Sequence, residues 1–170
     1  MTTEINNEYK PLMDILNEAQ TSHKAGAIIA AAAMVYIVID TMAWLSLPIG
    51  KKEQGRSDFC NFVNTYLKAD SSQTYQYFGK DVYAARCAVL HKFATLSELH
   101  LERPFPKKFG YLDNGPHCTN GIDLVLISVA VLLRDFSRAL EHFVTAMQND
   151  TELKSRVDSR ITELLNSSPL

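Results

Sequence analysis

The chain has 170 residues, of which 46% are apolar and 21% are charged, and this balance is typical of a globular domain. Its formal net charge of −2 gives no overall basic field and argues against a general DNA-binding protein. Three cysteines, Cys60, Cys87 and Cys118, without CxxC spacing favour reduced thiols in a cytoplasmic protein over disulfides or a zinc site. We therefore expect a single domain over residues 1–170 with no metal ion or cofactor.

The first half of the chain predicts three helices. Pro11 suits the first turn of a helix, and the apolar residues after it repeat at helical spacing as far as Thr21–Ser22. A cap there begins a long alanine-rich helix that we expect to reach Leu45. After a loop with Gly and Pro, Ser57 and Asp58 can cap a third helix. Its apolar stripe is Phe59, Phe62, Val63, Tyr66 and Leu67.

The alanine-rich helix invites comparison with a membrane span. Its uninterrupted apolar run, Ala25 to Ile39, has 15 residues, whereas a bilayer needs about 20. Asp40 ends the run, and a charged residue within a span is costly. We therefore predict a buried helix in a helical domain and no membrane association.

The second half of the chain begins with a helix and a turn-rich segment. We expect the helix from Asp81 to about Ala94, and the segment after it is dense in Pro, Gly and Asn. Asn114-Gly115 is a favourable tight-turn pair, so a small hairpin around Phe109 to Cys118 is expected.

Two further helices complete the chain. Asp123 opens the longest, whose apolar residues from Val129 to Met147 share one face, and a polar helix over about Thr151 to Leu165 follows. The predicted fold class is therefore all-α, a helical bundle with a small turn-rich or β-hairpin insertion near residues 105–120.

The helix predicted from Asp81 carries two unexpected residues, Arg86 and His91. Arg is rarely buried without a partner, and His titrates near neutral pH without perturbation. On a helical wheel His91 is rotated by about 140° from Arg86 and lies about 7.5 Å further along the axis. The two side chains are therefore expected to flank a strip of the helix rather than to point at each other. The core-facing stripe is Val82, Ala85, Val89 and Phe93, and the strip is Tyr83, Cys87 and Leu90.

Two copies of this helix packed across a two-fold axis would bring two Arg and two His side chains into one cleft. Arg supplies a permanent planar charge for a phosphate group, and His can move a proton near pH 7. This pair suffices for RNA cleavage without a metal ion, because His can take the 2′-OH proton or protonate the leaving oxygen. In the structural alternative, Arg86 extends along the surface and His91 is an ordinary polar surface residue.

The stretch "DVYAARCAVLH" supplies a more specific signal. Tyr83, Arg86, Cys87 and His91 form an aromatic-x-x-Arg-Cys-x-x-x-His pattern. This pattern resembles the HEPN superfamily (higher eukaryotes and prokaryotes nucleotide-binding), whose small all-α domains are built around an Arg-x4-His motif. The similarity is greater to HEPN-like bacterial and plasmid proteins, and the order of the predicted elements agrees over roughly residues 10 to 150.

The resemblance implies a homodimer through the motif helix, RNA as the ligand, and metal-independent endoribonuclease activity of a toxin or defence type. In the family the motif Arg contacts the phosphate and the motif His is the acid–base residue, roles that fall here on Arg86 and His91. Tyr83, Cys87 and Lys92 beside them are the expected substrate-binding residues. An antitoxin partner is also compatible with this resemblance.

Two departures favour an alternative, a catalytically inactive HEPN-like dimeric scaffold or partner-binding module. In active members the residue after the motif Arg is often Asn, Asp or His, and here it is Cys87. In toxins controlled by a paired nucleotidyltransferase antitoxin, a Tyr two residues after the His is modified. That position is Phe93 here, so this control is not expected.

Other polar residues are expected to be structural. His100 and His117 lack the paired spacing of ligands in a metal site, so we expect them in loops or at the surface. Ser97 belongs to no Gly-x-Ser-x-Gly motif, and no phosphate-binding glycine loop occurs in the chain.

Overall fold

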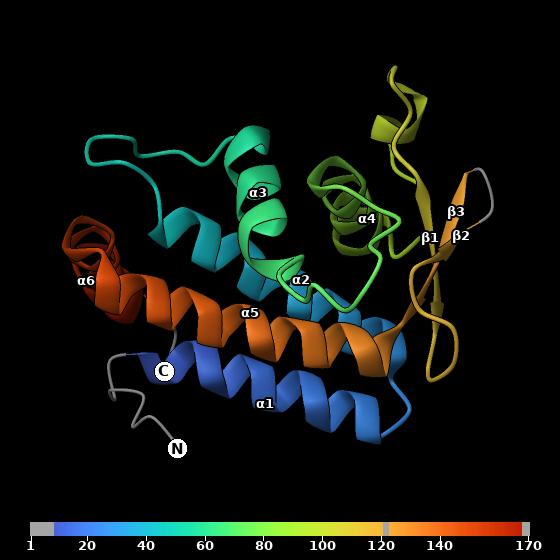
Figure 1. The fold of residues 1–170 in the computed structure, drawn as a ribbon, viewed down its shortest axis with the longest axis horizontal. Helices are drawn as coiled ribbons and strands as arrows, with labels where there is room; N and C mark the ends of the chain where they lie inside the picture. Colours follow the sequence, from blue (N-terminus) through green and yellow to red (C-terminus); the bar gives the residue numbers. More distant parts are fainter. Residues whose placement is uncertain (1–8, 121–122, 168–170) are drawn as a thin grey trace.

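The computed structural model describes residues 9–120 and 123–167, and this part of the chain is mostly helical (Figure 1). The predicted predominance of helix is thus confirmed, whereas a HEPN-like arrangement of the helices stays a prediction. In chain order the elements are α1 (Lys10–Lys24), α2 (Ile28–Leu45), α3 (Arg56–Phe62), a π-helical turn η2 (Val63–Leu67), α4 (Gly79–Lys92), a 3₁₀ turn η3 (Glu98–Leu101), β1 (Lys108–Leu112), β2 (Thr119–Asn120), β3 (Leu124–Ser128), α5 (Val129–Asn149) and α6 (Thr151–Ser167).

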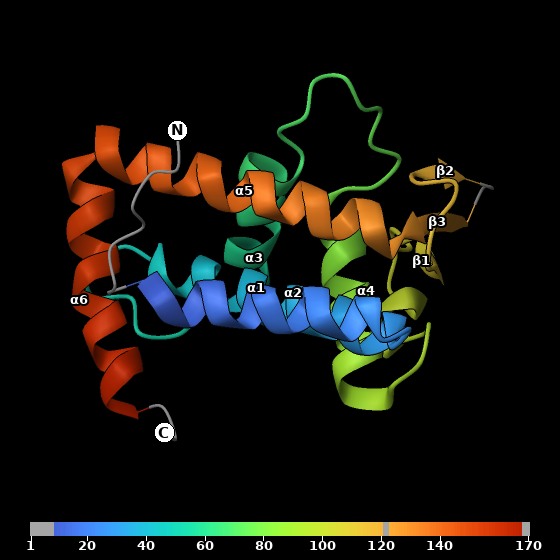
Figure 2. The ribbon, with the colours of Figure 1, turned by 90° about the horizontal axis from the view of Figure 1, so that it is seen from below.

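Helix α2 is the centre of the bundle, because it contacts each of the other α-helices. Helix α1 packs along it, α5 lies against both, and α3 and α4 pack together beside it. Figures 1 and 2 place α6 at one end of the long axis and the small sheet at the other, and Figure 2 shows α6 running across the direction of α1 and α5.

The burial of α2 explains its composition. Within the described chain it is the one helix long and apolar enough to cross a membrane, yet half of its residues are buried inside the protein. Alanine and valine side chains at its buried positions let neighbouring helices approach closely. Packing therefore accounts for the apolar character of α2, as the sequence predicted.

The junction of α1 and α2 differs from the prediction. The Thr21 hydroxyl donates to the carbonyl of Asn17 in its own helix, so it caps nothing, and α1 continues to Lys24. Gly26, with a φ of +80°, then turns the chain, and α2 begins at Ile28. A left-handed backbone at this position favours glycine, which lacks the Cβ that crowds that conformation.

The predicted hairpin and the predicted helix start at Asp123 are both wrong. Strand β1 pairs in parallel with β3, from Lys108 opposite Leu124 to Leu112 opposite Ser128, and β2 pairs antiparallel on the other side of β3. Helix α5 begins only at Val129, because the Ser128 hydroxyl accepts from the backbone N–H of Val131 and caps it there.

The carboxylate of Asp81 fixes the start of the motif helix α4. It is buried, and its two oxygens accept from the backbone N–H of Phe78 at 2.7 Å and of Lys107 at 2.8 Å. The first bond caps α4, and the second ties the chain entering β1 to the same point. One side chain thus sets the position of α4 relative to the sheet.

Glycine is required where α4 crosses α3. A Cβ on Gly79 would lie 2.3 Å from the carbonyl oxygen of Cys60 and 2.6 Å from its Cα. The backbone N–H of Gly79 also donates to the side chain of Asn64, at 2.9 Å. The two helices therefore meet backbone to backbone, which no larger residue allows.

Buried phenols bear on the stability of the fold at alkaline pH. Tyr36 of α2 and Tyr111 of β1 share a hydrogen bond of 2.7 Å between their hydroxyl oxygens. Burial, and then the neighbouring phenols, raise the pKa of Tyr36 well above 10.0; burial likewise raises the pKa of Tyr111 and Tyr77.

We therefore expect the free energy of unfolding to fall as the pH rises above about 10. There the unfolded chain has released phenolic protons that the folded chain still holds, so alkali favours unfolding. Tyrosinate absorbance should increase in two phases, the second coinciding with loss of helical circular dichroism. Titration of all the phenols in one phase, before any loss of helix, would contradict this expectation.

Candidate functional site

The side chain of Arg86 is anchored by Asp40, a residue of the central helix. Its Nε lies 2.6 Å from Asp40 Oδ2, and its Nη2 forms an ion pair with the same oxygen. Each side chain is 21% exposed, so the pair is partly shielded from water. The other oxygen of Asp40 accepts from Gln54 Nε2 at 3.0 Å. Asp40 therefore fixes two polar side chains from different segments.

This pairing keeps Arg86 charged. Partial burial of the guanidinium disfavours its charge, but the hydrogen bonds and the negative charge of Asp40 outweigh burial and raise the pKa of Arg86. In place of the structural alternative, in which Arg86 extends along the surface, the guanidinium is held by Asp40.

His91 lies in direct contact with Arg86, contrary to the prediction that the two side chains only flank a strip. Arg86 Nη1 is 3.1 Å from His91 Nε2. Guanidinium groups have no acceptor, so Arg86 donates and His91 Nε2 accepts, which places the ring proton on Nδ1. One copy of α4 thus brings a fixed cation and the lone pair of a neutral imidazole together.

A hollow of about 360 Å³ is lined in part by Arg86, while His91 is not among its lining residues, and we call it the motif hollow. The ring of Tyr83 faces two guanidinium groups, with the Cζ of Arg56 at 5.7 Å and that of Arg86 at 6.0 Å from the ring centroid. The hollow therefore combines a charged group, aromatic surface and hydrogen-bonding groups. Its lining is Asp40, Thr41, Trp44, Gln54, Gly55, Tyr83 and Arg86.

The three predicted substrate-binding residues differ in their surroundings. Tyr83 lines the motif hollow, and the sulfur of Cys87 accepts from Arg86 Nη1 at 3.8 Å. Lys92 is exposed and pairs with Glu98 at 3.3 Å, in the segment that follows α4. Tyr83 and Cys87 thus adjoin Arg86, whereas Lys92 is not among the residues that line the hollow.

Phe93 is not part of the core-facing stripe. Helix α4 ends at Lys92, and Phe93 has a left-handed backbone with φ 48° and is 74% exposed. Leu96, Leu101 and Phe105 further along are exposed too. We call these four residues the apolar segment. They expose apolar side chains in the stretch after His91, where a solvated loop would expose polar ones.

Sequence reasoning missed Asp40 and Gln54 as members of the site. Asp40 was conspicuous only as the residue that breaks an apolar run. The sequence did contain a signal for this contact. Asp40 ends an apolar run in one helix, and Arg86 stands among apolar residues in another, so each needs a partner of opposite charge when the helices pack.

His100 lies in the turn η3 and His117 in the loop before β2, as expected, but neither imidazole lies at the surface. His100 Nδ1 lies 3.0 Å from both the backbone nitrogen and the hydroxyl of Ser97, and so closes the turn η3. His117 lies 3.4 Å from the buried Asp135, whose carboxylate also accepts from Gln73 at 2.7 Å. Within residues 9–120 and 123–167, no group of three or more His, Cys, Asp or Glu side chains could hold a metal ion.

No protein-family model matches this chain, and neither a curated protein nor a solved structure matches it. The HEPN assignment therefore rests on the motif residues themselves.

Proposed function

We propose that this chain is a HEPN-like homodimeric protein that binds RNA at Arg86 and His91 and cleaves it without a metal ion. The observation that carries the proposal is the 3.1 Å contact between Arg86 Nη1 and His91 Nε2. A permanent cation beside a neutral imidazole is the minimum set for moving a proton next to a phosphate. A cytoplasmic toxin or defence protein fits this activity, with an antitoxin as a further partner.

The proposed reaction needs one base and one acid. In the proposed reaction Arg86 Nη1 turns from His91 Nε2 to the phosphate, and the freed Nε2 takes the proton of a ribose 2′-OH. The 2′ oxygen bonds to the adjacent phosphorus while the bond from phosphorus to the 5′ oxygen breaks. The leaving 5′ oxygen takes a proton from the imidazolium of the second copy. Arg86 stabilises the extra negative charge on the phosphoryl oxygens. The products are a 2′,3′-cyclic phosphate and a free 5′ hydroxyl.

The apolar segment supports the dimer part of the proposal. Phe93 follows the motif helix directly, and Leu96, Leu101 and Phe105 are further exposed apolar side chains in the next twelve residues. Exposed apolar surface of this kind marks contact sites in soluble proteins. A two-fold contact along α4 and this segment would cover it and bring two copies of His91 toward one cleft.

The test is RNA cleavage by the purified protein in the presence of EDTA. We expect cleavage to persist, the 3′ ends to be cyclic phosphates, and the protein to sediment as a dimer at micromolar concentration. A monomer at that concentration would count against the composite cleft, and cleavage that EDTA abolishes would count against the metal-free mechanism.

One observation favours the second candidate, an inactive HEPN-like dimeric scaffold. The charge of Arg86 is already balanced by Asp40, and a balanced guanidinium attracts a phosphate less strongly than a free one. In that case the dimer forms normally, RNA is not cleaved, and the Arg86–Asp40 pair serves to join α4 to α2.

A further inference from the structure

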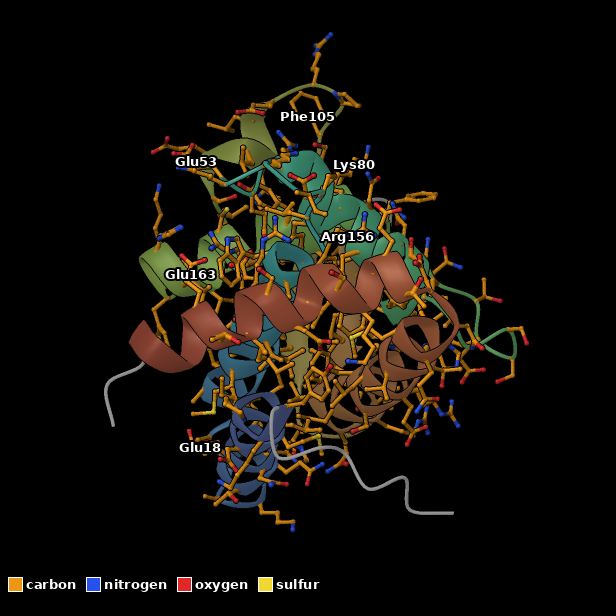
Figure 3. The ribbon with its side chains drawn as sticks, turned by 90° about the vertical axis from the view of Figure 1, so that its left-hand side faces the viewer. Glu18, Glu53, Lys80, Phe105, Arg156 and Glu163 are labelled. Atoms are coloured by element: carbon orange, nitrogen blue, oxygen red, sulfur yellow. The ribbon has the colours of Figure 1, made fainter. Side chains whose placement is uncertain are left out.

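A second hollow shares Trp44 with the motif hollow as a lining residue. Its volume is about 540 Å³, and it lies between α6 and the loop that follows α2. Figure 3 looks onto α6, with Arg156 and Glu163 labelled along the helix and the loop that carries Glu53 above it. Four of the lining residues are basic, and we call the hollow the basic groove. They are Lys51, Lys52, Arg156 and Arg160.

The basic groove keeps an excess of positive charge. Glu163 is the acidic residue of its lining, against four cations. Arg160 donates to the carbonyl oxygens of Leu47 at 2.6 Å and of Pro48 at 3.0 Å, and these neutral partners do not balance its charge. Lys51 pairs with Asp58 and Arg156 with Glu152, so Lys52 and Arg160 remain against Glu163, and the excess is one positive charge.

Trp44 connects the two hollows, because it lines both of them. Its indole Nε1 donates to the carbonyl of Lys52 at 3.4 Å, and the Cζ of Arg160 lies 6.0 Å from its ring centroid. Tyr83 provides a second ring inside the motif hollow. Arg86 and Tyr83 thus line the motif hollow, Arg160 lines the basic groove, and Trp44 lines both.

We propose that a single strand of RNA runs along this path, from the Arg86–His91 pair across Trp44 into the basic groove. The proposal rests on the proposed function and extends it by naming single-stranded RNA as the substrate and the basic groove as its second contact. Single strands are bound where a positive groove follows the phosphates and aromatic side chains stack on the bases. Paired bases are already stacked in a duplex and cannot reach the face of Trp44.

The test uses Trp44, the one tryptophan of the chain, as a fluorescent reporter in the His91→Ala variant, in which we expect cleavage to be too slow to disturb a titration. Single-stranded oligonucleotides of increasing length are titrated while binding is followed by anisotropy of a label on the RNA. We expect indole quenching by strands long enough to reach both hollows, and weaker binding of a hairpin duplex of equal length. The apparent affinity should fall steeply with salt concentration.

A double variant tests the basic groove itself. Ser155 and Ser159 are exposed on one face of α6 and line the groove, so Ser155→Glu with Ser159→Glu places two negative charges there without removing a packed group. We expect roughly tenfold weaker binding and a shallower dependence on salt. The matched control is Thr145→Glu with Gln148→Glu, which adds the same charge on the exposed face of α5.

The outcomes separate the two proposals. Binding by anisotropy without quenching of Trp44, or equal affinity for the two double variants, overturns the RNA path and leaves the Arg86–His91 site standing. Tighter binding of the duplex than of the single strand also overturns the path. A protein that binds no RNA by either readout overturns both proposals.

Discussion

Replacing His91 by Ala is expected to lower RNA cleavage by roughly 10²–10⁴-fold, the usual contribution of a general acid–base residue. The fold should be unaffected, because His91 is exposed and its contact with Arg86 is at the surface. Initial rates on a labelled oligonucleotide, with the melting temperature of each protein, measure both effects. His142→Ala, at an exposed position of α5, is the matched control and should cleave normally.

Variants of the anchoring pair test whether position as well as charge matters. Arg86→Lys keeps the charge, but a single ammonium cannot bind Asp40 through two nitrogens and reach His91 as well. Asp40→Asn keeps a hydrogen-bonding group and removes the balancing charge. We expect both variants to cleave RNA more slowly at saturating substrate. If the pair only stabilised the fold, the rate of cleavage at saturating substrate would be unchanged.

Full cleavage by the His91→Ala variant would end the catalytic assignment of His91.

Replacing Gly79 by Ala is expected to lower the free energy of unfolding by about 3 kcal/mol, and the melting temperature by roughly 6–12 °C. The added Cβ would lie 2.3 Å from a backbone oxygen of α3, so no rotation of a side chain can relieve the clash. Helices α3 and α4 must move apart or α4 must lose its first turn. Urea or thermal unfolding followed by circular dichroism measures the change.

Gly55→Ala is the control for the loss of a glycine as such. A Cβ there meets its nearest neighbour, the carboxylate of Asp58, at an ordinary 3.4 Å. We expect a loss of less than about 1 kcal/mol, the usual cost of Ala at a helix N-cap. Equal losses in Gly55→Ala and Gly79→Ala would mean that chain flexibility, and not the crossing of the helices, determines the effect.

The contact of Arg86 with His91 illustrates what a helical wheel cannot predict. The wheel gives the directions of the Cβ atoms, and for these two residues they diverge by about 140°. The guanidinium stands at the end of a long flexible side chain, and Asp40 decides where it lies. The motif residues were therefore predictable, but their geometry depended on a residue in another helix.

The errors around α5 and α4 have local causes. Leu124 to Ile127 is a short apolar run that suits a buried strand or the start of a helix, and pairing with β1 decides in favour of the strand. At the end of α4 the periodic pattern predicts Phe93 on the core-facing stripe, yet its left-handed backbone ends the helix. By contrast, the buried position of α2 followed from its composition together with Asp40.

Asp40 has a consequence for the newly made polypeptide, before any helix has packed. Helix α2 has a mean hydropathy of 2.0, within the range that membrane insertion machinery selects. An ionised carboxylate inside such a segment adds up to about 3 kcal/mol to the free energy of insertion. The residue that holds Arg86 in the folded protein thus also makes insertion of the same helix into a bilayer less favourable.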